Sequence, residues 1–258
     1  MSHQSGIQSL DRAFDIIEIL SCNPEGLHLM EVTHQTGLNK STVHRMLSSL
    51  SMLGYVKKDQ GTGRYYLTLK LFELSGRIVD GIDVLRAAMT PLATLRGVAQ
   101  EAIHLVVQEG NDIVYIHKVE SPSSSFRMVS RLGMRRPMYC TAVGKSILAM
   151  MKDEKVARIW EDSDIRAYTA NTLVRLEDLM EELRQIREQG YALDNEENEL
   201  GMRCIAAAIL DYTGQSRAAF SVSGPTMRMT DARIVELVPE VLSTSALISS
   251  ELGYKGKA

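Results

Sequence analysis

The chain has 258 residues, of which 45% are hydrophobic and 24% are charged, with a net charge of −3. This composition is typical of a folded globular protein with one or two domains, and it excludes a disordered or fibrous chain. Cys22, Cys140 and Cys204 are widely spaced and form no CxxC or Cys/His ligand pattern, which argues against a disulfide scaffold and a structural zinc site.

The N-terminal residues and the apolar runs indicate where the protein resides. The first residues lack the basic and apolar regions of a signal peptide, and the longest apolar run, Ile205 to Leu210, is too short to span a membrane. We therefore expect a cytoplasmic protein without a membrane partner, in a reducing compartment.

Charge is distributed unevenly along the chain. Residues 1–70 have a net charge of +1 and the remaining residues a net charge of −4. Within 40–66 there are five basic residues and one acidic residue. A local basic stretch in an acidic protein is what a nucleic-acid contact requires.

The first seventy residues predict a winged helix-turn-helix. Apolar residues recur at helical spacing, Gly37 provides a tight turn, and Asn39 is placed to cap the third helix. The predicted elements are helices at 9–20, 28–35 and 39–53 and strands at 55–58 and 64–68. In such a domain the third helix enters the major groove of DNA and the hairpin lies at the backbone or the minor groove.

The outward face of the third helix carries the candidate DNA contacts. It holds short hydroxyl side chains with His and Arg, which can reach phosphates and base edges. The candidates are Lys40, Ser41, Thr42, His44 and Arg45 on the helix, with Lys57, Lys58 and Arg64 on the hairpin. The alternative is a small helical core with a solvated polar face that binds nothing.

The remainder of the chain predicts a connector and a second domain. A helix at 69–84 continues from the hairpin, and we expect domains at 1–70 and 85–258 with a linker helix at 71–84. Short spacings between the first strands leave no room for crossover helices, so we predict an α+β fold with an antiparallel sheet. The predicted helices are 85–100, 143–151, 153–161, 175–189 and 231–252, and the predicted strands are 103–108, 113–119, 126–131, 204–210 and 218–223.

Enzyme motifs fail at identifiable positions. A Walker A loop ending at Lys145 would need a glycine at the position of Tyr139, and a nucleophile elbow would need one at the position of Ser221. His104 and His117 lie on apolar strands without ligand spacing, so we assign them structural roles and expect no metal. We therefore expect neither an enzyme nor a cofactor.

The second domain instead carries the features of a binding pocket. Ser221 and Ser223 project to one face of their strand, and Cys204 begins a row of small residues. The helix that opens at 141–144 offers free N–H groups to a carboxylate. Asp194, which begins an acidic run, either accepts hydrogen bonds from ligand hydroxyls or belongs to a solvated loop.

Two alternatives use the cysteines. Cys204 or Cys140 could serve as the nucleophile of an enzyme, although no histidine lies near either of them in the sequence. The same two thiols could instead make the domain a redox sensor.

Several motifs together resemble the IclR family of bacterial transcription regulators, over nearly the whole chain. They are QSLDRA at 8–13, GLNKSTVHRML at 37–47, LGYV at 53–56, PMYCTAVGK at 137–145, GYALDNEENELGMRCIA at 190–206 and SVSGP at 221–225. The segments TLKLFEL at 68–74 and IVYIHKV at 113–119 look most like the branch that controls catabolism of sugar acids and pectin products.

The resemblance implies a winged helix domain, a dimerising linker helix and a GAF-like effector domain, assembled as a homodimer or tetramer. It also implies a pocket for small carboxylates such as keto acids, aromatic acids or sugar acids. The implied pocket residues are Met128, Ala142, Val143, Asp194, Cys204, Ser221 and Ser223, and Gly144 lies at the same helix start. Small residues are common in the family where this chain has Val143, so its pocket is expected to be narrower or differently shaped.

The sequence thus predicts a DNA-binding transcription regulator that represses a catabolic operon. A small carboxylate would shift the effector domain between arrangements and thereby alter operator binding.

Overall fold

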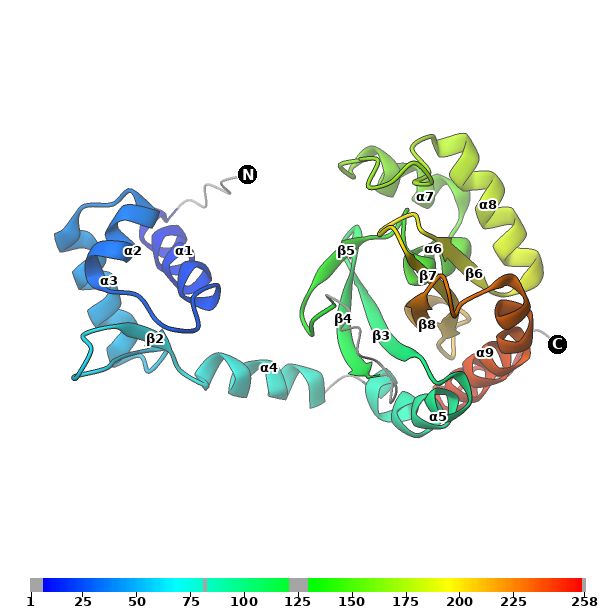
Figure 1. Cartoon of the computed structure of the whole chain (residues 1–258), viewed down its shortest axis with the longest axis horizontal. Coiled ribbons are helices and arrows are strands. Elements are labelled where there is room, and N and C mark those ends of the chain that lie inside the picture. Colours follow the sequence, from blue (N-terminus) through cyan, green and yellow to red (C-terminus); the bar gives the residue numbers. More distant parts are fainter. Residues whose placement is uncertain (1–6, 81–82, 121–129, 257–258) are drawn as a thin grey trace. The chain divides into compact units, whose positions relative to one another are not determined.

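The computed structural model of the chain describes residues 7–80, 83–120 and 130–256 (Figure 1). The chain separates into two compact units, Met1–Gly81 and Ile82–Ala258. The helix α4 (Lys70–Asp80) follows the hairpin and belongs to the first of these units. A separate linker helix at 71–84 remains a prediction.

The first unit is a helix-turn-helix with a two-stranded wing. Its elements are α1 (Gln8–Ser21), α2 (Leu29–Thr36), α3 (Lys40–Met52), β1 (Val56–Lys58), β2 (Tyr65–Leu67) and α4 (Lys70–Asp80). Gly37 ends α2 in a left-handed conformation, with φ of 66°. The Asn39 side chain accepts a hydrogen bond from the Thr42 amide and caps α3. These two residues set the turn between the helices, as predicted.

One apolar core joins these elements. Ile16 of α1, Val32 of α2 and Val43 and Leu47 of α3 are fully buried, and Tyr65 of the wing packs with them. The strands β1 and β2 pair antiparallel. The 3.6-residue periodicity of the sequence therefore located this core correctly.

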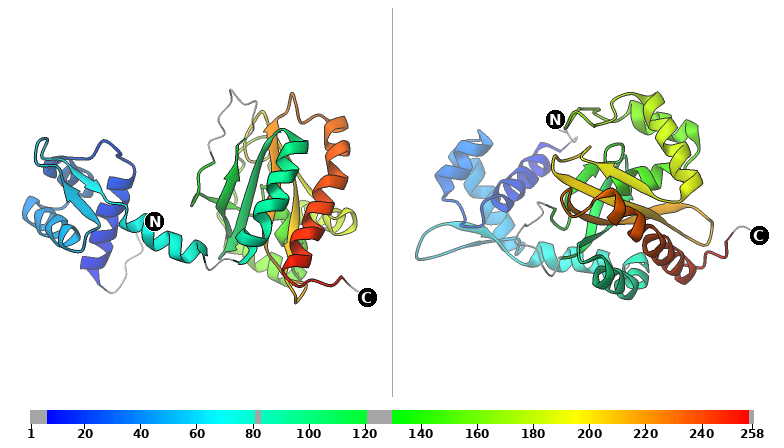
Figure 2. Two further views of the ribbon diagram at one scale, coloured as in Figure 1. Left: turned by 90° about the horizontal axis from the view of Figure 1, so that it is seen from below. Right: turned by 45° about the vertical axis from the view of Figure 1, so that its right-hand side comes forward.

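The second unit is an antiparallel sheet between two layers of helices (Figure 2). The strand order is β5-β4-β3-β8-β7-β6. The strands are β3 (Ala102–Glu109), β4 (Asp112–Val119), β5 (Arg135–Pro137), β6 (Ala192–Asn195), β7 (Met202–Leu210) and β8 (Ser216–Pro225). The helices are α5 (Asp83–Ala99), α6 (Ala142–Ala149), α7 (Asp153–Glu161), α8 (Leu176–Gln189) and α9 (Asp231–Glu251).

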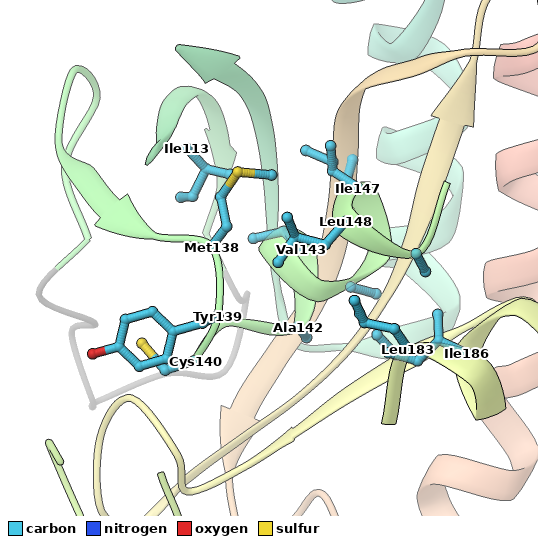
Figure 3. Packing of buried hydrophobic residues seen from close by; sticks show 14 of the residues in the cluster. Ile113, Met138, Tyr139, Cys140, Ala142, Val143, Ile147, Leu148, Leu183 and Ile186 are labelled. Carbon is cyan, nitrogen blue, oxygen red and sulfur yellow. The ribbon is translucent and has the colours of Figure 1, made fainter. Parts of the chain in front are cut away.

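Each face of the sheet has its own core. On one face, α5 and α9 bury Leu92 and Ile234 against Ile103 and Phe220 of the sheet. On the other face, α6, α7 and α8 form a second apolar cluster, in which Ile147 and Leu148 join Leu183 and Ile186 (Figure 3). The second cluster lies on the same side of the sheet as the predicted pocket residues.

The α+β class with an antiparallel sheet is confirmed, and two strands were missed. Both are edge strands, β5 with three residues and β6 with four. Such short segments show no alternation of apolar and polar residues. In the strand predicted at 126–131, residues 126–129 lie outside the described residues, and 130–131 are not part of a strand.

Candidate DNA surface and effector pocket

The helix α3 presents a polar face to solvent. Ser41, His44 and Arg45 are exposed, while Val43 and Leu47 between them are buried in the core of the first unit. Lys40 is also exposed and Thr42 is half-buried at the first turn. The side chain of Asn39 accepts a hydrogen bond from the Ser41 hydroxyl at 3.0 Å. The candidate residues of α3 therefore form one surface that begins at the positive end of the helix.

The cations on this unit differ in their surroundings. Within the described part of the chain, Arg45 makes no ion pair with a carboxylate. Lys57 and Lys58 on β1 are exposed and lie over the rings of Tyr66 and Tyr65, at 6.0 and 5.5 Å from the ring centroids. The guanidinium of Arg45 is thus available for an external partner.

Arg64 is held by the protein itself. Its Nη1 donates to the carbonyl oxygen of Gly26 at 2.6 Å and lies 3.9 Å from Oε2 of Glu31. Its side chain is 33% exposed. These contacts tie the wing to α2 and to the loop before it, so they give Arg64 a structural role beside the DNA contact predicted for it.

A small cavity of about 50 Å³ opens between the sheet and the start of α6. Of the eight predicted ligand residues, the lining includes Ala142, Val143, Asp194, Cys204, Ser221 and Ser223. Met128 lies outside the described residues. The lining does not include Gly144, because its backbone faces that of Met138.

Several lining residues were not predicted as ligand contacts. They are His104, Tyr115, Ser130, Met134, Arg136, Thr141, Asn198, Glu199 and Met202. His104 had been assigned a structural role from its apolar strand. Its register partner on β8 is Ser221, so both side chains lie on the pocket face of the sheet. Only the strand pairing reveals this.

Hydroxyl groups and one imidazole form a chain of hydrogen bonds at the cavity. The Oγ atoms of Ser221 and Ser223 are 3.0 Å apart, and Ser223 Oγ is 3.3 Å from Nδ1 of His104. Nε2 of His104 lies 2.8 Å from Oγ of Ser130. Burial, with a contribution from the charge of Lys118, lowers the pKa of His104 to about 3. The imidazole is therefore neutral, and this chain can donate to or accept from a ligand.

Asp194 lies on the edge strand β6, opposite Cys204 of β7. Its Oδ1 accepts hydrogen bonds from the backbone N–H groups of Glu197 and Asn198, at 2.7 and 3.4 Å. Burial, together with the nearby charge of Glu197, raises the pKa of Asp194 to about 7. The carboxyl is buried and belongs to the pocket, so it is not part of a solvated loop.

The start of α6 supplies further donors. The Thr141 hydroxyl accepts from the Gly144 N–H at 3.2 Å and caps the helix. The N–H groups of Ala142 and Val143 donate to no acceptor among the residues that the structure describes. Two free donors at the positive end of a helix suit a carboxylate.

The thiols do not have the properties of a nucleophile or a redox sensor. Burial raises the pKa of Cys140 to about 12, and burial also raises the pKa of Cys204. Reactive thiols instead have lowered pKa values that favour the thiolate. The structure therefore disfavours both alternatives that rest on these cysteines. Over residues 7–80, 83–120 and 130–256, no group of three or more His, Cys, Asp or Glu side chains is arranged to hold a metal ion.

Two family models match the chain in the order of its units. The model described as "IclR helix-turn-helix domain" matches residues 9–60, and the model described as "Bacterial transcriptional regulator IclR C-terminal" matches residues 76–250. The chain belongs to the IclR family of bacterial transcriptional regulators. This membership confirms the resemblance found in the sequence, and it confirms that the chain is a regulator and not an enzyme.

Curated relatives agree with membership in the IclR family. The chain is 38% identical over 248 residues to the HTH-type transcriptional regulator KdgR of Escherichia coli K12, covering 96% of this chain and 94% of the relative. It is 35% identical over 252 residues to the DNA-binding transcriptional repressor YiaJ of the same organism, covering 97% and 89%.

Solved IclR structures share the fold. The crystal structure of the Thermotoga maritima IclR has a TM-score of 0.85 and 32% identity, covering 96% of this chain and 99% of that chain. The C-terminal domain of E. coli KdgR has a TM-score of 0.61 and 37% identity, covering 67% of this chain and all of that domain. In the part of our chain that is described, no helix has the length and apolar character to cross a membrane.

Proposed function

We propose that this IclR-family regulator is a repressor of a catabolic operon whose operator binding responds to a small carboxylate, such as a keto acid or a sugar acid. The observation that carries the carboxylate assignment is that Ala142 and Val143 line the cavity at the start of α6, where their N–H groups donate to no acceptor among the described residues. Support for repression comes from YiaJ, whose name describes a DNA-binding transcriptional repressor.

The first unit would bind double-stranded operator DNA through α3. Ser41 and Thr42 would contact phosphates or base edges near the helix start, and Arg45 would contact a guanine or a phosphate. Lys57 and Lys58 of the wing would contact the DNA backbone. Operator binding would take place in the cytoplasm.

The protein would work as a homodimer or tetramer. Leu10 and Phe14 on α1 are 51% and 59% exposed, and Phe72 on α4 is 74% exposed. Large exposed apolar side chains on helices are typical of surfaces that pack against another chain. The two helix-turn-helix units of a dimer would then bind two half-sites of an operator.

The response would be a shift between pre-existing arrangements. A ligand that binds one arrangement of the effector domain more tightly increases the population of that arrangement. If the distance between the two helix-turn-helix units of the dimer differs between the arrangements, operator affinity changes with ligand occupancy.

The experiment first selects duplexes that the full-length protein retains from a random DNA library. The selected duplex is then titrated with protein in the presence and absence of pyruvate, D-gluconate, D-galacturonate and benzoate at millimolar concentration. We expect tight binding that at least one of these carboxylates changes. Failure to enrich any sequence contradicts the DNA-binding assignment, and an affinity that none of the carboxylates changes contradicts the carboxylate assignment.

A further inference from the structure

Every strand of the large sheet contributes a side chain to the cavity. The contributing residues are Arg136 on β5, Tyr115 on β4, His104 on β3, Ser221 on β8, Cys204 on β7 and Asp194 on β6. The row begins at one edge of the sheet with a cation and ends at the other edge with an acid. The two ends of the cavity therefore differ in charge.

Arg136 is the cation at the first edge. It is half-buried, and it is the one Lys or Arg among the described residues that line the cavity. Nη1 of Arg136 donates to the carbonyl oxygen of Arg135 over 3.4 Å, and no carboxylate of the described residues pairs with it. The guanidinium of Arg136 therefore has no counter-ion among the described residues and is available to an anion from outside the chain.

The neighbouring Arg135, at the same edge of the sheet, has hydrogen-bond partners within the protein. Arg135 donates from Nε to Oδ2 of Asp112 at 3.2 Å and from Nη2 to the carbonyl oxygen of Glu109 at 2.7 Å. Successive residues of a strand point to opposite faces, so Arg135 faces away from the cavity while Arg136 lines it. The two residues have the same charge and different surroundings.

Ala142 and Val143, whose N–H groups donate to no acceptor among the described residues, line the same cavity as Arg136. A guanidinium and a helix start together match the charge and the donor requirement of one carboxylate. The opposite edge differs, because Asp194 and the exposed Glu199 line it. A second carboxylate would meet these two acids there, whereas ligand hydroxyls could donate to them.

We propose that Arg136 is a specificity-determining residue that anchors the carboxylate of a hydroxylated monocarboxylate at the start of α6, with the ligand hydroxyls directed toward Asp194. The neutral chain of Ser221, Ser223 and His104 lies between the two ends and offers further hydrogen bonds. This inference rests on the proposed function as a carboxylate-responsive regulator, and it adds the orientation of the ligand and the selection for a single carboxylate.

The test compares six-carbon ligands that carry one, two or no carboxyl groups. Calorimetric titration of the full-length protein uses D-gluconate and D-galacturonate as monocarboxylates, D-glucarate and galactarate as dicarboxylates, and D-glucose and D-galactose as neutral sugars. We expect at least one monocarboxylate to bind more tightly than its dicarboxylate and its neutral counterpart. Tighter binding of either counterpart, or no binding of any monocarboxylate, overturns the inference.

Variants then assign the preference to one side chain. Arg136→Met should weaken monocarboxylate binding about 10- to 100-fold, because it removes hydrogen bonds between charged groups. Arg136→Lys retains the charge but not the planar guanidinium that can donate two hydrogen bonds to one carboxylate, so it should lose less affinity than Arg136→Met. The matched control Arg135→Met removes the same charge outside the cavity and should leave the dissociation constant unchanged.

Two further measurements separate this inference from a merely structural role and from the proposed function. Arg136→Met should retain the thermal unfolding midpoint and operator affinity of the ligand-free protein, and its binding should no longer distinguish the monocarboxylate from the neutral sugar. If wild type binds the selected operator and responds to a monocarboxylate while Arg136→Met binds that compound equally well, the inference is overturned and the proposed function stands. If wild type binds no operator, the proposed function fails, and the dissociation constants still decide the role of Arg136.

Discussion

Nζ of Lys145 lies 2.6 Å from Oε1 of Glu197, and both side chains are buried. Nζ also lies 3.1 Å from Oε1 of Glu182 on α8. Burial lowers the pKa of Lys145, but the two carboxylates outweigh burial and raise it. Since the backbone N–H of Glu197 donates to Asp194, this ion pair connects α6 to the acidic end of the pocket.

Removing the cation should destabilise the second unit strongly. Lys145→Met leaves Glu197 buried without its partner, and breaking a buried pair in this way costs about 3–5 kcal/mol. Urea unfolding measures the loss. The control Arg184→Met breaks an exposed pair with Glu181 on α8, which is worth at most about 1 kcal/mol. Equal losses in the two variants would contradict a stabilising role of the buried pair.

Gly144 should not tolerate a methyl group. A Cβ at this position would lie 2.3 Å from the carbonyl oxygen and 2.4 Å from Cα of Met138, and backbone atoms cannot move aside cheaply. We expect Gly144→Ala to cost about 1–3 kcal/mol or more through overpacking. The control Gly97→Ala lies in α5 with open space around the new methyl, and it should stabilise the helix by about 0.5–1 kcal/mol. Thermal unfolding of both variants measures the difference, and a neutral Gly144→Ala would contradict the clash.

Arg45 should contribute to operator affinity. Arg45→Ala should weaken binding to the selected duplex by ~1–3 kcal/mol if the guanidinium makes a bidentate contact with guanine. Fluorescence anisotropy titration at constant salt measures the change. Arg86→Ala, which removes an exposed arginine of α5, serves as the control for the loss of one charge. An affinity that Arg45→Ala leaves unchanged removes Arg45 from the DNA surface.

Asp194 should make stability depend on pH. Its pKa is about 7 in the folded chain and near 3.8 without burial, so folding favours the protonated form. Below about pH 4 the carboxyl is protonated in both the folded and the unfolded chain, so it does not lower the free energy of unfolding. As pH rises from 4 toward 7, this free energy falls by about 4 kcal/mol at most. Asp194→Asn retains an acceptor oxygen for the Glu197 N–H and does not titrate.

The comparison of these two proteins isolates the carboxyl. Urea unfolding between pH 4 and pH 8 should show the stability of wild type falling relative to that of Asp194→Asn across this window. Glu197 and Lys145, which also titrate or carry charge near this position, are present in both proteins. A difference that stays constant with pH would show that Asp194 titrates as an exposed carboxyl does.

The sequence by itself determined the helices, the long strands and which face of α3 is polar and exposed. These features depend on local periodicity: Val43 and Leu47 recur at helical spacing, and Ser221 and Ser223 alternate on a strand. A helix or a long strand repeats its spacing of apolar residues several times, so the sequence predicts it without knowledge of the elements that pack against it. Family motifs in both units then indicated a regulator with an effector pocket.

Only the tertiary structure decided which side chains meet at the pocket. Edge strands β5 and β6 are too short to carry a pattern, so Arg136 could not be distinguished from Arg135 before the pairing of β5 with β4 was known. His104 reaches the cavity because β3 pairs with β8 in one register. Strand pairing joins residues far apart in the chain, and a one-residue slip would turn each side chain to the other face.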